Sequence, residues 1–173
     1  AVQARRIARE RDRANQEAKA AGQVSDFLVG LFKVSDPSEA LGNTITAREI
    51  LDKGSARMSD ELKEQPQIRA RLMDTMGVVY KNLGLYKQAA GLLEQALDTR
   101  RLTLGPDHPS VSESLASLAQ LRYAIGNYQE AERFFRESLD IRRKSSGDED
   151  LKVSESLNDL AMSLNAQGRY AEA

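Results

Sequence analysis

The sequence contains a single histidine, His108, within the segment LGPDHPSV at residues 104–111. Histidine is a common general base and metal ligand near neutral pH. Catalysis would need an orienting partner beside the ring, and a metal would need further ligands. The chain has no cysteine and no second histidine, so we interpret His108 as structural. Pro109 suits the first position of a following helix, and Asp107 and His108 are expected to bond its free backbone N–H groups.

Ser110 and Glu113 are spaced as a capping box at the same joint. Carboxylates are the other groups that could do chemistry. The segments SDELKE (59–64) and GDEDLK (147–152) carry several of them, but on expected solvent-facing helix surfaces or loops. Acid–base catalysis needs a buried, convergent pair, which no part of the sequence indicates. We therefore expect no enzymatic activity, no metal site and no cofactor in these residues.

The composition excludes other functions. Lys and Arg number 25 against 26 Asp and Glu, which argues against general nucleic-acid binding. The longest apolar run is FLVGLF at residues 27–32, far short of the ~20 residues of a membrane span. Both ends are expected to be cut from a longer protein. We expect a soluble, cytoplasmic fragment, with any membrane anchor of the parent lying upstream of Ala1.

The elements that would position any site follow a repeat of 42 residues. Sets of equivalent residues share this spacing: Gly84, Gly126 and Gly168; Tyr86, Tyr128 and Tyr170; Ala89, Ala131 and Ala173. Each unit is interpreted as two helices, because apolar residues recur every three or four positions. Glycine between them permits a left-handed helix C-cap. Small residues at 77, 119 and 161 would let two helices approach closely. The fold class is therefore all-α.

The segments LASLAQLRYAIGNYQEAERFFRESL and LNDLAMSLNAQGRYAEA make this pattern resemble the tetratricopeptide repeat, in the 42-residue form of kinesin light chains. MDTMGVVYKNLGLYKQAAGLLEQAL fits too, with Met where Trp or Leu is usual. The resemblance covers about residues 67–173, as two full repeats and a truncated third. It implies an α-α solenoid, a right-handed superhelix. Arg122 stands where the first unit has Tyr80, which weakens that core position.

The resemblance implies a concave groove, lined by the first helix of each unit, that holds a peptide or a partner protein. Asn158 is the best single candidate, because an amide bonds both a peptide N–H and a C=O. The alternative is that these are ordinary exposed helix residues. The family's groove positions fall on Arg71, Asp74, Val78, Lys81, Ala116, Gln120, Tyr123, Asn158, Met162 and Asn165.

Residues 1–34 are expected to form a long N-terminal linker or stalk helix, rich in Ala and Arg. Two interpretations stay open: a solvated linker, or a dimerising or membrane-adjacent stalk. Residues 35–66 are expected to form a degenerate capping hairpin, with a break at 36–43. Thr46 and Glu49 are spaced as a capping box that opens its helix.

The segment SDFLVGLFKVSDPSEALGNTITAREILDKG resembles the region that follows the catalytic domain in bacterial eukaryotic-like serine/threonine kinases. The similarity spans about residues 24–80. No kinase motif is present here: there is no Gly-rich phosphate loop, and Asp26-Phe27 is followed by Leu28 rather than Gly. The resemblance implies that this chain is the regulatory region of a larger bacterial signalling protein.

Two functions follow from the sequence. The first is a scaffold that binds a protein or peptide in the groove. The second is a self-association module that dimerises the parent chain through the N-terminal helix or the C-terminal end. At that end, GRYAEA at residues 168–173 is expected to begin a second helix. Its absence beyond Ala173 would leave Leu157, Leu160 and Leu164 uncovered.

Overall fold

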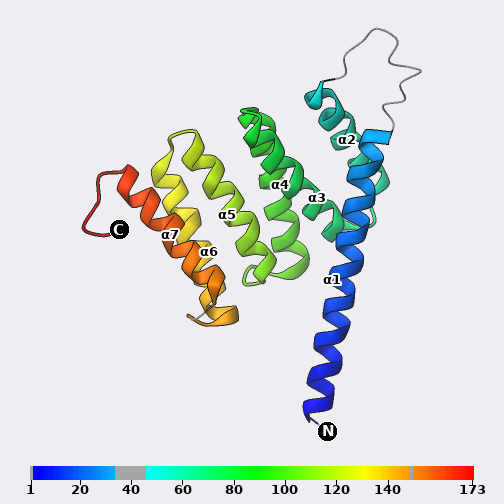
Figure 1. Cartoon of the computed structure of the whole chain (residues 1–173), viewed down its shortest axis with the longest axis horizontal. Helices are drawn as coiled ribbons and strands as arrows, with labels where there is room; N and C mark the ends of the chain where they lie inside the picture. The colour runs from blue at the N-terminus through cyan, green and yellow to red at the C-terminus, as the bar shows by residue number, and fades with distance from the viewer. Residues whose placement is uncertain (1, 34–45, 149) are drawn as a thin grey trace. The chain divides into compact units, whose positions relative to one another are not determined.

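In the computed structural model, the residues described are 2–33, 46–148 and 150–173, and they form helices joined by turns (Figure 1). The all-α fold class is thus confirmed. The expected break at residues 36–43 lies outside the described range. The helices are α1 (Val2–Lys33), α2 (Ala47–Glu61), α3 (Pro66–Asn82), α4 (Tyr86–Leu104), α5 (Pro109–Ala124), α6 (Tyr128–Ser146) and α7 (Leu151–Ala166).

The chain divides into two compact units, Ala1–Ile68 and Arg69–Ala173. In the first unit, α1 packs on α2, and the Arg57 guanidinium lies 5.7 Å from the centre of the Phe27 ring. The capping box at the start of α2 is confirmed: the Thr46 hydroxyl accepts from the Glu49 N–H, and the Glu49 carboxylate accepts from the Thr46 N–H. The expected three-part division stays a prediction, because its middle segment begins within residues 34–45, outside the described range.

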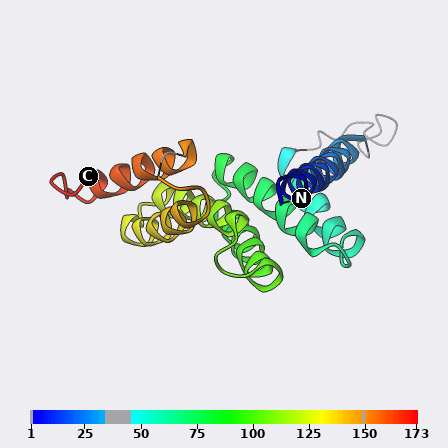
Figure 2. The same ribbon diagram turned by 90° about the horizontal axis from the view of Figure 1, so that it is seen from below.

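The second unit follows the 42-residue register closely. The helices α4 and α6 both have 19 residues and begin at Tyr86 and Tyr128. The helices α5 and α7 both have 16 residues and begin at Pro109 and Leu151. Within this unit, successive helices pack in chain order, α4 on α5, α5 on α6 and α6 on α7 (Figures 1 and 2).

Glycine ends each first helix as the sequence predicts. Gly84 has φ of +74°, which a residue with a Cβ rarely adopts. Around it, the Leu85 N–H donates to the Tyr80 carbonyl at 2.9 Å, and the Gly84 N–H donates to the Lys81 carbonyl at 3.0 Å. This is the pair of bonds of a Schellman motif, which satisfies the last carbonyls of α3.

The small residue at the helix crossing is also confirmed. A Cβ added to Gly77 would lie 2.7 Å from two side-chain atoms of Leu93, a fully buried residue of α4. One repeat later, Ala119 is fully buried in a cluster with Ala131 and Phe135. Leu118 is 1% exposed, as the register predicts for a core position. Small residues therefore set how closely the two helices of a unit pack.

The joint between α4 and α5 corrects one expectation and confirms another. His108 is the N-cap of α5, and its Nδ1 accepts from the Ser110 N–H at 3.1 Å, with Pro109 at the first helical position. The expected Ser110–Glu113 capping box is wrong, because the helix begins two residues earlier than that pairing requires. The Glu113 carboxylate instead faces the Lys152 ammonium at 3.5 Å.

The Arg122 side chain adapts to a position that holds Tyr80 in the preceding repeat. Its guanidinium pairs with the carboxylates of Glu94 and Glu130, each at 2.7 Å. At the end of the chain, the residues from Tyr170 form a turn rather than the expected start of a helix. A segment of four residues forms too few hydrogen bonds to offset the entropy lost in nucleating a helix. On α7, Leu157 is 43% exposed, as expected without a covering helix, whereas Leu164 is buried, so the expectation that Leu164 lies uncovered is wrong.

Candidate functional site

The ten residues predicted to line a groove all lie on the first helices of the units: α3, α5 and α7. Nine of them form three rows at the 42-residue spacing, and Arg71 stands apart. Their surroundings differ. Arg71, Gln120, Asn158, Met162 and Asn165 are exposed; Val78, Lys81, Ala116 and Tyr123 are half-buried; Asp74 is buried.

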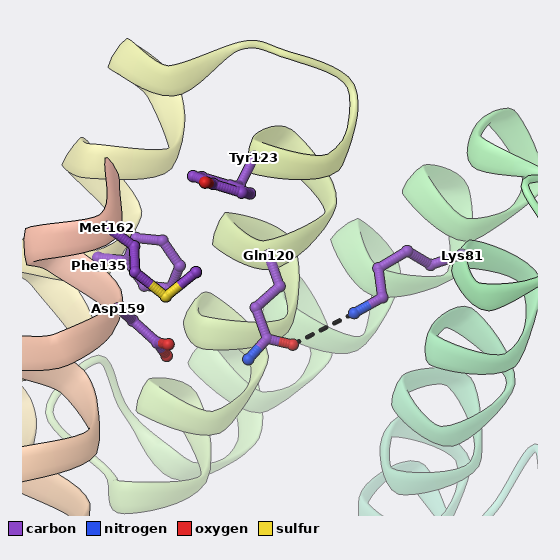
Figure 3. Close-up of a pocket in the computed structure, with 6 residues that line it drawn as sticks. All are labelled: Lys81, Gln120, Tyr123, Phe135, Asp159 and Met162. Atoms are coloured by element: carbon purple, nitrogen blue, oxygen red, sulfur yellow. Dashed lines mark hydrogen bonds between the residues drawn. The ribbon is translucent and has the colours of Figure 1, made fainter. Parts of the chain in front are cut away.

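Four of the ten line one cavity of about 210 Å³ in the second unit: Lys81, Gln120, Tyr123 and Met162. The cavity also takes Phe135 from α6 and Asp159 from α7 (Figure 3). It therefore draws side chains from four helices that are far apart in the sequence. A cavity of this kind, part apolar and part polar, is the usual form of a binding site.

The apolar side of the cavity is rigid at its base and open at its rim. Phe135 is 3% exposed and packs in the core cluster with Ala119 and Ala131. Tyr123 packs against the same cluster, and its ring centre lies 5.2 Å from that of Tyr128. Met162 is 45% exposed and caps this side with a flexible thioether.

The polar side of the cavity is a chain of three side chains, one from each first helix. The Lys81 ammonium donates to the Gln120 Oε1 at 3.2 Å (Figure 3). The Asp159 carboxylate lies on the other side of Gln120, whose side chain acts to lower the pKa of Asp159. The residue numbers 81, 120 and 159 are 39 apart, so each partner lies nearly one helical turn earlier than the strict repeat position.

Partial burial disfavours the charged forms of both Lys81 and Asp159. It lowers the pKa of Lys81, which the distant Asp159 carboxylate only partly offsets. It raises the pKa of Asp159, against the hydrogen bond from Gln120 and the attraction of Arg142 and Lys81. Each charged group is therefore less stable here than it would be in water.

Asp74 has a different setting from the rest of its row. Its carboxylate lies 2.6 Å from the Arg100 guanidinium, and the Ser114 hydroxyl donates to both of its oxygens. Burial raises the pKa of Asp74 to about 6, although Arg100 and Ser114 act to lower it. This network joins α3, α4 and α5 from inside, so Asp74 does not present an open surface to a ligand.

Two of the cavity residues are not among the ten groove positions predicted from the sequence. Asp159 lies one position beyond Asn158, and the groove positions taken from the family exclude it. Phe135 belongs to a second helix, whereas the expected groove is lined by first helices. Asn158, chosen as the best candidate, lies outside the cavity lining, and its amide contacts the Met162 sulfur at 3.8 Å. A 39-residue spacing of polar side chains is the signal that would have found Asp159.

A metal site needs converging ligands, and a membrane span needs a long apolar helix. Across residues 2–33, 46–148 and 150–173, no three His, Asp or Glu side chains are grouped so that they could hold a metal ion. In the same ranges, every helix is too short or too polar to cross a bilayer.

Comparison with protein families gives a match to the tetratricopeptide repeat over residues 68–144 and 123–173. Among curated proteins, Nephrocystin-3 of Xenopus tropicalis is 37% identical over 92 residues, which is 53% of this chain. Nephrocystin-3 of Homo sapiens is 44% identical over 52 residues, or 30% of this chain. The chain spans about 6% and 4% of the lengths of these two relatives.

Two solved structures share the fold. A putative kinesin light chain of Podosopora anserina, with nearly identical TPR-like repeats, superposes with a TM-score of 0.68 at 23% identity. That match covers 87% of this chain and 69% of the other. BtubC (BKLC) from P. vanneervenii superposes with a TM-score of 0.62 at 18% identity, over 92% of this chain and 70% of the other.

Proposed function

Because this chain belongs to the tetratricopeptide repeat family, we propose that it is a protein-binding scaffold. Stacked helix pairs of this family commonly mediate contacts between proteins. In this chain the partner would bind along α3, α5 and α7, with one of its side chains in the cavity between Lys81 and Met162. No catalytic step is proposed for it.

The observation that carries this proposal is the cavity itself. Its apolar side is exposed at Met162, its base is the rigid Phe135, and its polar side offers a donor, an amide and an acceptor. Apolar area gives affinity, and a few fixed polar groups give orientation. Arg71, Asn158 and Asn165 are exposed on the same helices and would contact the partner outside the cavity.

Site-specific crosslinking tests the proposal. A photoreactive amino acid is placed at Met162, and as a matched control at Leu102, which is 88% exposed on α4 and does not line the cavity. Crosslinked partners are identified by mass spectrometry and then tested against Met162→Glu and Leu102→Glu. The proposal expects capture from position 162 and loss of binding in Met162→Glu only. Equal capture from both positions would contradict it.

We also propose a context for this scaffold: the regulatory region of a larger signalling protein such as a bacterial serine/threonine kinase. The resemblance of residues 24–80 to the region after such kinase domains supports it. Determining the sequence encoded upstream of Ala1 tests it. A Gly-rich phosphate loop and a catalytic loop there would support the proposal, and a different upstream domain would refute it.

A further inference from the structure

Two opposite charges stand at the two ends of the cavity's polar side. Lys81 comes from α3 and Asp159 from α7, with the neutral amide of Gln120 between them (Figure 3). Within the described residues, neither charge has a salt-bridge partner within 4.0 Å. The two charges are thus separated by Gln120 and form no direct ion pair, although each weakly stabilises the other.

Each charge has unused bonding capacity. An ammonium has three donors, and Lys81 uses one of them on Gln120. The Asp159 carboxylate has several acceptor sites, and within the described residues Gln120 is the side chain whose hydrogen bonding acts to lower its pKa. Burial lowers the pKa of Lys81 and raises the pKa of Asp159, so both ions are incompletely compensated. Each would be stabilised by an opposite charge brought by a ligand.

The space beside these charges fits one large apolar side chain. An engineered apolar cavity of about 150 Å³ holds a benzene molecule. The cavity here measures about 210 Å³, with the buried Phe135 at its base and the Met162 thioether at its rim. Thioether sulfur and aromatic carbon both make favourable contacts with such a side chain.

We propose that the cavity recognises a protein segment of mixed charge: an acidic residue against Lys81, an apolar side chain over Phe135 and Met162, and a basic residue against Asp159. This inference rests on the proposed binding function and specifies the chemistry of the partner. In an extended segment, alternate residues point to the same face and lie about 7 Å apart. The three contacts therefore come from alternate positions of the partner.

The arrangement also disfavours partners whose two charged residues have the same sign. A segment with two acidic residues would place one of them against Asp159, and a segment with two basic residues would place one against Lys81. Both are disfavoured by like-charge repulsion in a partly desolvated site. The cavity can therefore reject diacidic and dibasic segments by repulsion as long as its two ends carry opposite charges.

Three synthetic peptides of nine residues test this proposal. Their central five residues are Glu-Ser-Leu-Ser-Lys, Glu-Ser-Leu-Ser-Glu and Lys-Ser-Leu-Ser-Lys. Binding is measured by chemical-shift titration of the labelled chain at low salt. The wild-type chain should bind the mixed peptide about threefold to tenfold more tightly than either other peptide, as expected for one favourable pair replaced by repulsion. Shifts should centre on Gln120 and Met162.

Charge reversals then change the preference. Asp159→Lys makes both ends basic and should bind the diacidic peptide best, whereas Lys81→Glu should bind the dibasic peptide best. Matched controls are Lys87→Glu and Asp98→Lys, which make the same charge changes at exposed positions of α4. The controls should keep the wild-type order of affinities. Asp159→Asn and Lys81→Gln replace the reversals if thermal melts show that those unfold.

Two results would overturn the proposal. One is that the charge-reversal variants and the control variants change the order of peptide affinities in the same way, or that neither set changes it. The other is the absence of binding by any of the three peptides at millimolar concentration. Neither result refutes the scaffold function, which the crosslink from Met162 and the Met162→Glu variant test separately with the natural partner.

Discussion

Arg100 and Arg142 lie one repeat apart and make equivalent contacts. The Arg100 guanidinium donates to the Ser110 carbonyl at 2.6 Å and to the Ser114 hydroxyl at 3.0 Å. The Arg142 guanidinium donates to the Lys152 carbonyl at 2.9 Å and to the Ser156 hydroxyl at 2.6 Å. Each arginine fastens a second helix to the first helix of the next unit. Of the two arginines, Arg100 also pairs with the buried Asp74, whereas Arg142 has no such partner because the residue one repeat after Asp74 is Ala116.

This difference predicts unequal losses of stability. Arg100→Ala should lower the free energy of unfolding by about 3–5 kcal/mol, because it leaves the buried Asp74 without its counter-charge. Arg142→Ala should cost about 1.5–3 kcal/mol, the loss of hydrogen bonds from a charged donor. Urea denaturation measures both. Adding Asp74→Ala to Arg100→Ala should recover part of the loss, and a double variant no more stable than the single one would contradict this account.

Asp74 should also make stability depend on pH. Its pKa is about 6 in the folded chain against 3.8 for the exposed group, so the folded state binds the proton more readily. Its stabilising contribution is complete below about pH 4 and is lost as the pH rises through 6. The free energy of unfolding of the wild type, minus that of Asp74→Asn, should fall by about 2.5 kcal/mol between pH 4 and pH 7. Other acids cancel in this difference. A difference that rises with pH would show that Arg100 outweighs burial.

The close crossing at Gly77 predicts that even one methyl group is harmful. Gly77→Ala should destabilise the second unit by about 1–3 kcal/mol, because the new Cβ would overlap the buried Leu93. Gly91→Ala is the matched control on α4, where a Cβ meets nothing within 4 Å. It should stabilise the chain by about 0.5–1 kcal/mol through helix propensity. Thermal melts of the two variants should therefore shift in opposite directions.

His108 should be replaceable by a residue that caps a helix in the same way. Asp150 holds the equivalent position before α7, and its carboxylate accepts from the Lys152 N–H at 2.7 Å. His108→Asp should therefore keep the stability of the wild type, whereas His108→Ala should lose about 1 kcal/mol. A zinc titration followed by calorimetry checks the alternative role. Stoichiometric binding that disappears in His108→Asp would show that the imidazole is a metal ligand.

The repeat could be predicted from the sequence because its signal is redundant. Gly84, Gly126 and Gly168 fix the phase, and apolar residues at helical spacing fix which face is buried. The helices and the core residue Leu118 follow from these two facts. A structural role for His108 follows from the sequence, because there is no cysteine or second histidine to complete a metal site. The capping box expected at Ser110 is ruled out, because α5 begins at Pro109.

The site was harder to predict, because it depends on contacts between units rather than within one. Asp74 was expected to face a ligand, but its long-range partner Arg100 lies on a different helix and draws it inward. Asp159 joins the cavity through a 39-residue offset, which reflects how successive first helices are displaced along one another. Such displacement is a property of packing, and a 42-residue periodicity does not contain it.

In the second unit, the glycines with positive φ are Gly84, Gly105, Gly126, Gly147 and Gly168, at intervals of 21 residues. A helix and its turn thus occupy the same length throughout the second unit, whether the helix is first or second in its pair. An insertion or deletion therefore keeps the helix pairs in phase only when its length is a multiple of 42 residues. Removing residues 109–150 would join equivalent positions and leave a shorter array with its inner surface in phase. Removing 21 residues would place two first helices, or two second helices, in succession. Every later helix would then lie on the opposite surface of the array.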